Sequence, residues 1–492
     1  MASVDYGDVQ GLVRFGYGRM KEACFYLLVV ENPDAARAWL SSAPVTSAVA
    51  VQPPPERALQ VALTWEGLLK LGLPSSAGEG FSAEFISGMA GEESRSRRLG
   101  DAGPSAPAGW RWGGPGKVPH LLVMLYANPG GLEGWKHAIK TDTWATAFRE
   151  MAYLPTSDLD GVEPFGFVDG ISQPTVDWHG EPRAKDDDLE YSNLAALGEF
   201  LLGYQNEYGK YTVRPLVAEA EDPQRLLPAA EDDAGRRDLA RNGTYLVFRQ
   251  LAQDVRGFWQ FLDAQASGRP EERRRLAEAM VGRTMAGEPL VPVSDRRIAG
   301  VDSEDRRNRF TYGADSTGIR CPVGAHIRRA NPRNADFPAG TTGFWSRLLR
   351  IGGFGRKDFR DDLVSSVRFH RILRRGREYG PGLSPEDSVR PGRPDDGERG
   401  LHFICVNANI GRQFEFVQNA WMMGTTFAGL SDESDPLLGN RAPIAGDTFS
   451  MPQENGAPRW ITGMPQFVTV RGGSYFFLPS LAALRYVAAL GQ

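Results

Sequence analysis

The 492-residue chain has few of the residues that build metal cages and covalent frameworks. Its three cysteines, Cys24, Cys321 and Cys405, are widely spaced and form no CxxC pair, which suits a reducing cytosol and argues against a disulfide framework. Its six histidines include no HExxH motif and no pair at helical ligand spacing. The sequence therefore argues against the usual zinc sites and leaves a single histidine as the candidate metal ligand.

Long apolar runs and nucleotide-binding motifs are also missing. No apolar run approaches the roughly 20 residues that span a bilayer, and Met1–Asp8 shows no basic region, apolar stretch or twin arginine of an export signal. No GxGxxG follows a strand, and no P-loop or GxSxG elbow is found. The net charge of −5 gives no reason to expect nucleic acid as a partner. We expect a cytoplasmic protein with no membrane span and no nucleic-acid partner.

What the sequence does contain is a mixture of short buried strands and amphipathic helices. They do not alternate regularly as in a doubly wound parallel sheet, so the pattern predicts an α+β fold with antiparallel sheets. The strands are expected at Cys24–Val30, Leu59–Leu63, His120–Tyr126, Thr244–Leu251, Leu401–Val406 and Phe467–Val470, and helices at Pro33–Leu40, Asp254–Leu262 and Arg412–Met422.

One combination of strand and helix occurs twice. Phe25–Val30 is followed by a helix carrying Trp39, and Thr244–Arg249 is followed by a helix carrying Trp259. We interpret this as a repeat that divides the chain into two similar domains, residues 1–241 and 242–492. Two unrelated amphipathic units would give the same short match.

Three polar or irregular stretches are expected to lie outside the core. The charged stretch Ala184–Arg241 is predicted to be a solvated excursion that joins the two halves. Phe337–Asp362 is a second irregular stretch, and Pro391–Arg399 is predicted to be a polar loop.

A carboxylate lies where packing needs no charge. Asp169 stands between Val168 and Gly170 in the segment Gly166–Gly170, which continues as Ile171-Ser172-Gln173-Pro174. An aspartate in a turn rich in glycine and proline commonly serves local backbone hydrogen bonds. The alternative is a functional carboxylate, and it depends on a partner elsewhere in the chain.

Such a partner lies about 150 residues further on, where His326 precedes Arg328, Arg329 and Arg333. A single imidazole is what haem iron needs on its proximal side. Arginines near it could neutralise the two haem propionates. A histidine on the surface or in the core is the plainer alternative. Together with Asp169, the segment indicates a buried anionic cofactor with acid–base chemistry above it.

A second basic segment, Phe369–Gly380, is followed by an apolar strand. Its usual interpretation is a solvated basic face, but one arginine after two apolar residues could enter a cavity and stabilise an oxygen anion. Leu401 and Phe403 share one side of the strand, opposite His402 and Ile404. Beside a haem they would keep the cavity small and dry, and as core residues they would look the same.

These segments together resemble the dye-decolourising (DyP-type) haem peroxidases, in length and insertions the larger, fungal-like subgroup. The resemblance implies two ferredoxin-like α+β modules with antiparallel sheets, of the dimeric α+β barrel type, and long loop insertions. Residues 1–241 would carry the GxxDG segment, and residues 242–492 would bind one haem b per chain. The matching segments are Asp8–Gly11, Gly166–Pro174, Gly198–Tyr204, Gly324–Arg333, Ile372–Gly376, Gln413–Trp421 and Arg471–Pro479.

The resemblance also implies a role for individual residues. Asp169 matches the distal acid–base aspartate, His326 the proximal iron ligand, and Arg374 the distal arginine, with Arg375 as the competing register. Gly376 occupies the position where compact bacterial members carry a distal asparagine. The proximal carboxylate stays open among Asp432, Asp435 and Glu415. The cofactor contacts would be Phe167, Val168, Gly170, Ile171, Leu401, Phe403, Arg328, Arg329 and Arg333.

The activity implied is a peroxidase that reduces hydrogen peroxide and oxidises bulky aromatic donors such as dyes and phenolics. Asp169 would move a proton between the peroxide oxygens, and Arg374 would stabilise the departing hydroxide. Aspartate remains a base at low pH, so an acidic optimum is expected. A haem-binding or haem-delivery protein with incidental peroxidase activity is the alternative, and a cofactor-free α+β protein is a third hypothesis. The sequence is compatible with a homo-oligomer.

Overall fold

The computed structural model describes residues 4–180, 193–291, 307–308, 310–333, 366–392, 397–441 and 446–491. The irregular stretch predicted at Phe337–Asp362 lies outside these residues. Parts of the stretches predicted at Ala184–Arg241 and Pro391–Arg399 also lie outside them.

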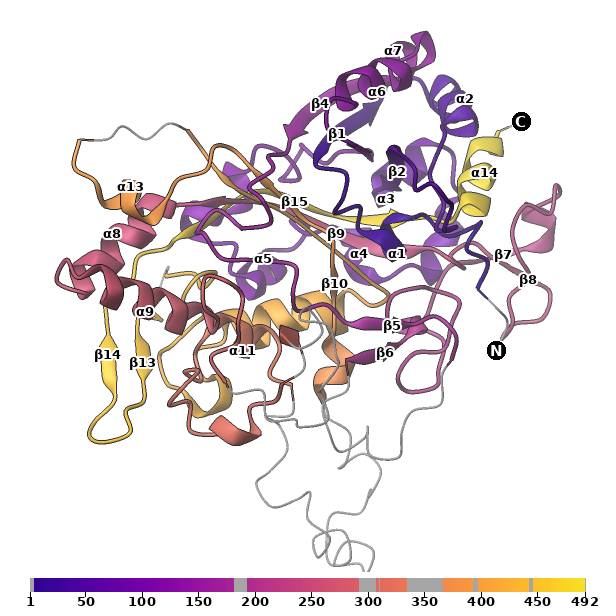
Figure 1. Ribbon diagram of the computed structural model, residues 1–492. Coiled ribbons are helices and arrows are strands. Elements are labelled where there is room, and N and C mark those ends of the chain that lie inside the picture. The colour runs from indigo at the N-terminus through magenta and orange to yellow at the C-terminus, as the bar shows by residue number, and fades with distance from the viewer. Residues whose placement is uncertain are drawn as a thin grey trace, which may run out of the picture.

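Within the described residues, one nine-stranded antiparallel sheet runs through the molecule (Figure 1). Its order is β10-β12-β9-β15-β2-β3-β1-β4, and β11 also pairs with β12. The strands are β1 (Glu22–Val30), β2 (Arg57–Leu63), β3 (Leu121–Ala127), β4 (Phe148–Pro155), β9 (Thr244–Gln253), β10 (Leu373–Arg374), β11 (Arg377–Tyr379), β12 (Gly400–Asn407) and β15 (Val468–Leu478).

The two halves of the sheet have the same topology. Numbered along the chain, the strands of each half stand in the order second, third, first, fourth: β2-β3-β1-β4 and β10-β12-β9-β15. Each first strand leads into a helix, α2 (Pro33–Ser42) after β1 and α8 (Val255–Gln265) after β9. A side chain caps each helix, because Asn32 accepts from the Ala35 N–H and Asp254 from the Gly257 N–H. The short sequence repeat therefore corresponds to a repeated structural unit, while the division at 241/242 stays a prediction.

The predicted strands coincide with β1, β2, β3, β9, β12 and β15, but β15 is longer than expected. Its glycines would ordinarily weaken a strand, and here they allow close packing. A Cβ atom on Gly472 would lie 2.5 Å from the indole nitrogen of Trp112, and one on Gly473 would lie 2.6 Å from the Met89 sulfur. The helix predicted at Arg412–Met422 is π-helical, in two segments, η10 (Gly411–Glu415) and η11 (Val417–Met423).

Helices and small strand pairs surround this sheet (Figure 1). The C-terminal helix α14 packs against α2, so the end of the chain lies against the N-terminal half. The other helices are α1 (Leu12–Phe15), α3 (Trp65–Lys70), α4 (Ala83–Ser87), α5 (Glu93–Leu99), α6 (Leu132–Ile139), α7 (Asp142–Ala147), α9 (Pro270–Val281), α11 (His326–Ala330), α13 (Pro385–Val389) and α14 (Leu481–Ala489). The pairs are β5 (Thr175–Asp177) with β6 (Leu194–Ala196), β7 (Leu216–Ala218) with β8 (Arg236–Asp238), and β13 (Phe449–Met451) with β14 (Arg459–Ile461).

The sheet is buried on both faces. Along β1, Tyr26 and Leu28 belong to one apolar cluster and Phe25 and Leu27 to another, as the alternation of side chains in a strand requires. The first cluster also contains Leu251 of β9, on the face that carries the cavity described below.

The charged stretch between the halves is only partly solvated in its described part, residues 193–241: residues 231–236 are exposed, whereas residues 238–241 are buried. Arg214 and Asp238 are buried there and form an ion pair of 2.6 Å. Glu199 is buried too and pairs with Arg412 at 2.6 Å. The sequence prediction therefore holds for the exposed residues and not for these pairs, because charged residues that pair with one another can be buried although their sequence looks like a solvent-exposed loop.

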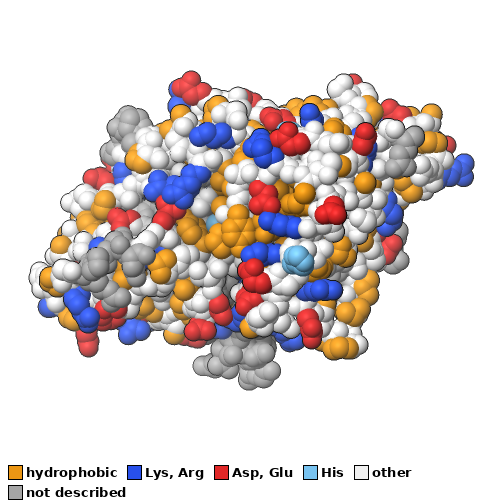
Figure 2. Space-filling model, turned by 90° about the horizontal axis from the view of Figure 1, so that it is seen from above, with side chains coloured by type: hydrophobic (Ala, Val, Ile, Leu, Met, Phe, Trp, Pro, Cys, Tyr) orange, Lys and Arg blue, Asp and Glu red, His pale blue; other side chains and the backbone are white. Residues whose placement is uncertain are grey.

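The surface carries charges of both signs. On the face shown in Figure 2, basic and acidic side chains are interspersed around a central apolar area. No helix in the described ranges is both long and apolar enough to cross a membrane.

The two halves of the sheet meet where β15 pairs with β2, at Phe477 and Leu63. Phe477 is 1% exposed, and its ring lies 5.3 Å from that of Phe81. We expect Phe477→Ala to lower the free energy of unfolding by about 3–5 kcal/mol, because the lost ring leaves a cavity. Denaturant unfolding followed by circular dichroism measures the change. Trp460→Ala, at a side chain 56% exposed, should change it by about 0.5 kcal/mol or less. An equal loss of unfolding free energy in the two variants would contradict the conclusion that Phe477 stabilises the junction between the two halves of the sheet.

Candidate active site

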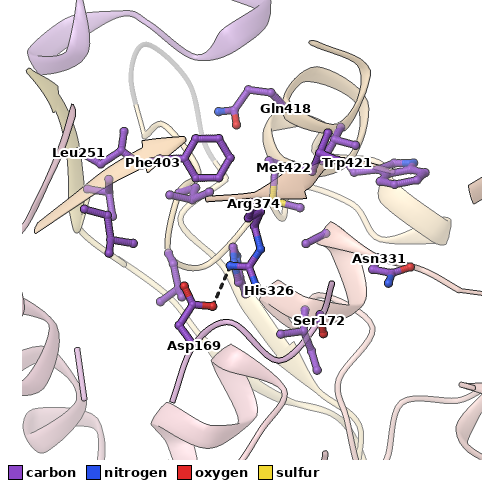
Figure 3. A pocket seen from close by; sticks show the side chains of 18 of the residues that line it. Asp169, Ser172, Leu251, His326, Asn331, Arg374, Phe403, Gln418, Trp421 and Met422 are labelled. Carbon is purple, nitrogen blue, oxygen red and sulfur yellow. Dashed lines mark hydrogen bonds and ion pairs between the residues drawn. The ribbon is translucent and has the colours of Figure 1, made fainter. Parts of the chain in front are cut away.

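A cavity of about 260 Å³ lies in the C-terminal half of the sheet. Strands β9, β10, β12 and β15 contribute one part of its lining, and α11 and η11 contribute another. In Figure 3, Phe403 and Leu251 lie on one side, Trp421 and Met422 on another, and Arg374, His326 and Asp169 between them.

His326 begins α11 and is fixed by a buried carboxylate. Its Nδ1 lies 2.9 Å and 3.1 Å from the two oxygens of Asp435. Burial alone would lower the pKa of His326, but the charge of Asp435 outweighs it and holds that pKa above its usual value. Burial would raise the pKa of Asp435, but His326 outweighs it and keeps that pKa low. Asp435 therefore accepts the Nδ1 proton and leaves the Nε2 lone pair available for a metal ion.

The other two candidates for the proximal carboxylate lie elsewhere. Asp432 is exposed. Glu415 accepts the Tyr475 hydroxyl at 2.9 Å and pairs with Arg95 at 2.8 Å. Of the three carboxylates that the sequence left open, Asp435 is the one in contact with His326.

Asp169 and Arg374 form an ion pair in the same cavity. The Arg374 Nη1 donates to Oδ1 of Asp169 at 2.7 Å (dashed line in Figure 3). Burial alone would raise the pKa of Asp169, but the charge and hydrogen bond of Arg374 outweigh it, so that pKa lies below its ordinary value. Gln173 ties the turn to β10, since it accepts from the Arg374 N–H at 3.0 Å and donates to the Arg374 carbonyl at 3.2 Å.

The turn around Asp169 depends on two glycines with positive φ, Gly166 at 99° and Gly170 at 82°. A Cβ on Gly170 would meet nothing within 4 Å. Glycine is therefore needed there for the backbone conformation rather than for space. Gly170 is also not part of the cavity lining, which differs from the sequence prediction that it contacts the cofactor.

Arg374 at the end of β10 and Arg375 directly after it point to opposite sides of the sheet. Arg374 lines the cavity, whereas Arg375 does not and donates to the carbonyls of Leu12 and Val13, each at 2.7 Å. The alternation of side chains along a strand separates the two. At Gly376 a Cβ would lie 2.6 Å from the His402 carbonyl oxygen, so no side chain fits at this position.

Five further predicted contacts line the cavity: Phe167, Val168, Ile171, Leu401 and Phe403. Leu401 and Phe403 share one side of β12. His402, on the opposite side, is buried with its Nε2 3.1 Å from the Pro155 carbonyl. The apolar wall expected from the strand pattern is therefore present.

The three arginines after His326 do not line the cavity, which differs from the prediction that they bind the cofactor. Their guanidinium groups bond to backbone carbonyls. Arg328 donates to Cys321, Arg329 to Trp421, and Arg333 to Asn308, each at 2.7 Å. The short helix α11 turns His326, Ile327 and Ala330 toward the cavity, and these arginines secure the loops behind it.

Other polar residues that the sequence analysis did not single out line the cavity. Arg371 donates to the Leu194 carbonyl at 3.2 Å, and Arg283 donates to the Ser172 hydroxyl at 2.9 Å. Arg371 belongs to the basic segment Phe369–Gly380, and the composition of that segment could have indicated Arg371 as a site residue. Glu163 and Gln253 line it too and carried no signal, because only the folded chain brings them there.

Known proteins resemble the chain over nearly its whole length. A dye-decolorizing peroxidase of Auricularia auricula-judae is 28% identical over 516 residues, covering 98% of this chain and 86% of the relative. The multifunctional dye peroxidase of Amycolatopsis sp. is 30% identical over 452 residues, covering 87% of this chain and 81% of the relative. The crystal structure of a decolorizing peroxidase from A. auricula-judae superposes with a TM-score of 0.72 at 26% identity, covering 99% and 100% of the two chains. No protein-family profile matches the chain.

The fold, the cavity and these likenesses define an α+β peroxidase. The chain belongs to the dye-decolorizing peroxidase family, and its relatives include fungal members, which confirms the resemblance to the fungal-like subgroup. It is an oxidoreductase that acts on peroxide, and the cofactor of its family is haem. The predicted α+β architecture with antiparallel sheets is also confirmed.

The cavity residues fit a haem held by one imidazole. In the described part of the chain, no three His, Cys, Asp or Glu side chains gather as ligands for a metal ion. His326 instead offers a single Nε2 whose ring is oriented by Asp435. The lining beside it is largely apolar and includes Val417, Trp421 and Leu437, as a porphyrin ring requires.

We expect Asp435→Ala to weaken haem retention by about 10- to 100-fold, because the His326 ring loses the acceptor that orients it. The Soret absorbance of the purified protein and a hemin titration measure this. Asp432→Asn, at the exposed carboxylate three positions earlier, is the matched control and should bind haem as the unmodified protein does. Equal haem affinity in the two variants would argue against Asp435 as the orienting group.

Proposed function

We propose that this peroxidase reduces hydrogen peroxide with Asp169 as proton acceptor and donor, Arg374 as charge stabiliser and His326 as the iron ligand of one haem b per chain. The observation that carries the proposal is the 2.7 Å Asp169–Arg374 pair in the cavity that also holds His326. A haem held by His326 would supply the two electrons that cleavage of the peroxide O–O bond needs, and donors would replace them one at a time.

Asp169 is suited to move a proton between the two peroxide oxygens. Its lowered pKa keeps it ionised and ready to take a proton from one oxygen. It then delivers that proton to the other oxygen, which leaves as water. The Arg374 guanidinium, permanently charged, stabilises the negative charge that develops on the departing oxygen. Leu401 and Phe403 exclude bulk water beside them and strengthen both interactions.

The cofactor contacts of the proposal follow the cavity lining. His326 would hold the iron, and Phe167, Val168, Ile171, Leu401 and Phe403 would pack on the ring. Arg371 would take over the neutralisation of a propionate, because Arg371 lines the cavity and the arginines after His326 do not.

The donors we propose are bulky aromatic molecules, dyes and phenolics among them. The support is the name that the relatives share, dye-decolorizing peroxidase. A cytoplasmic location is proposed as well, and its support is the state of Cys24, Cys321 and Cys405, which are all free and buried.

Replacing Asp169 tests the peroxidase proposal against haem binding or delivery with incidental activity. We expect Asp169→Asn to bind haem normally, because Asp169 makes no contact that holds His326. We expect its kcat/KM for peroxide to fall by about 100- to 10,000-fold, because the amide cannot accept and return a proton. Stopped-flow spectra after one equivalent of peroxide report both properties. Unchanged peroxide turnover with haem bound would favour the haem-binding alternative.

The pH dependence of the peroxide reaction tests the role of Arg374. The pKa of Asp169 is depressed, so its proton-accepting form persists as pH falls and is lost only below the ordinary aspartate value of about 3.9. The acid limb of kcat/KM should therefore lie below that value. In Arg374→Leu the burial of Asp169 loses its largest opposing effect, so the limb should move to higher pH. A limb at the same pH in both proteins would show that another group is the base.

A further inference from the structure

A second carboxyl group lines the cavity, and the proton transfer just described does not use it. The side chain of Glu163 accepts three hydrogen bonds. Its Oε1 accepts from the Phe167 N–H at 3.1 Å, and its Oε2 accepts from the Phe165 N–H at 3.0 Å and the Gln253 Nε2 at 2.8 Å. Two of these donors belong to the peptide segment that leads to Asp169, and the third belongs to the buried strand β9.

The backbone around Glu163 forms a tight hairpin that ends at Asp169. The Glu163 N–H donates to the Phe167 carbonyl at 2.8 Å, and Val162 bridges Val168. At the open end, the Asp169 N–H donates to the Gly161 carbonyl at 3.2 Å. The Glu163 carboxyl group therefore lies inside the hairpin and bonds it to β9.

Asp169 is consequently held from two sides. Gln173, four residues after it, bonds to the backbone of Arg374 on β10. Glu163, six residues before it, bonds to Gln253 on β9. Strands β9 and β10 both pair with β12, so both anchors lie in the same sheet.

We propose that Glu163 is a positioning residue for the peroxide reaction, whose carboxyl group fastens the hairpin 161–169 to β9 and so fixes where Asp169 meets the peroxide. The inference rests on the proposed function of Asp169. A displacement of about 1 Å in a reacting group can lower a rate by about 100-fold, so the fastening has a measurable consequence.

The protonation state of Glu163 should make the peroxide reaction depend on pH. Burial raises the pKa of Glu163 to about 7, against the opposing effect of its hydrogen bonds, and the charge of Asp169 adds to the rise. Glu163 is therefore neutral at acidic pH and ionises as pH rises through about 7. The neutral carboxylic acid of Glu163 keeps its hydrogen bond to Gln253 of β9. The Oε1 of Gln253 has no hydrogen-bond partner among the described residues, and a half turn of the Gln253 amide brings this oxygen to the Glu163 hydroxyl.

Ionisation of Glu163 places a second negative charge near Asp169. The other charged groups that face Asp169 are Arg374 and His326, which favour its ionised form, and Glu378, whose pKa is raised by burial and then by the charge of Asp169. Added negative charge opposes the charge that develops on the departing oxygen. We therefore expect kcat/KM for peroxide to fall as pH rises through about 7.

The test compares Glu163→Gln and Glu163→Asp in the haem-loaded enzyme. The amide introduced by Glu163→Gln presents an NH2 group where peptide N–H groups point, and it cannot ionise. This variant should therefore lower kcat/KM by about 10- to 100-fold and remove the fall near pH 7. In Glu163→Asp the shorter side chain cannot reach both peptide donors but still ionises. Glu163→Asp should therefore have a lower kcat/KM but keep the fall of kcat/KM at alkaline pH. The comparison distinguishes the effect of the position of residue 163 from the effect of its charge.

Glu378→Gln is the matched control, because it removes a largely buried carboxyl group that senses Asp169 but makes no hydrogen bond to the hairpin. It should keep kcat/KM at pH 5 within about twofold and retain the fall near pH 7. If Glu163→Gln does not fold, Gln253→Leu breaks the same link and should lower kcat/KM by about tenfold.

Two outcomes overturn the inference and are distinct from failure of the proposed function. One is an unchanged kcat/KM and an unchanged fall near pH 7 in Glu163→Gln while Asp169→Asn is inactive. The other is an unchanged kcat/KM in Gln253→Leu. Full activity of Asp169→Asn would overturn the proposed function itself.

Discussion

The site depends on one electrostatic contact in the cavity, the ion pair between the half-buried side chains of Asp169 and Arg374. Neither charge is stable alone beside the apolar side chains of Phe403 and Leu401, because burial penalises an unpaired ion. Together they keep the aspartate ionised and hold the guanidinium in the cavity, where we propose that peroxide reacts. The turn at Gly170, the Gln173 bonds to β10 and the Glu163 hairpin all serve to bring these two groups within 2.7 Å.

The same physical principle operates at His326. The imidazole of His326 keeps the buried carboxylate of Asp435 ionised, and that carboxylate in turn orients the imidazole ring. In and beside the cavity, Asp169 and Asp435 have lowered pKa values, whereas Glu163 and Asp101 have raised ones. At Asp101 burial outweighs even the paired Arg249, and for the other three the difference lies in their partners. Asp169 faces a permanent cation and Asp435 an imidazole, whereas Glu163 has neutral N–H donors, which do not offset its burial.

The two halves of the sheet share a topology but differ in one connection, and this difference explains why the C-terminal half holds the site. Both halves have the strand order second, third, first, fourth, and both have a capped helix after the first strand. In the N-terminal half, α6 and α7 connect the third and fourth strands. In the C-terminal half the equivalent connection contains η10 and η11, whose wider π-helical turns present Val417, Trp421 and Met422 to the cavity. The segment Gly161–Pro174 comes from the N-terminal half of the chain, so the cavity requires both halves.

The sequence by itself determined six of the nine strands of the sheet, the repeat, and the residue types of the site, because periodicity, the GxxDG turn and the isolated His326 are local features of the chain. It did not indicate β4, β10 or β11. The sequence also placed Leu401 and Phe403 on the same face of their strand, since the alternation of side chains along a strand follows from backbone geometry. Only the tertiary structure decided which arginine meets Asp169, which carboxylate meets His326, and that the arginines after His326 bond to backbone carbonyls instead. Those choices depend on contacts between segments about 100 to 200 residues apart. The energy of a buried charge is set by its neighbours in space, which no single segment specifies.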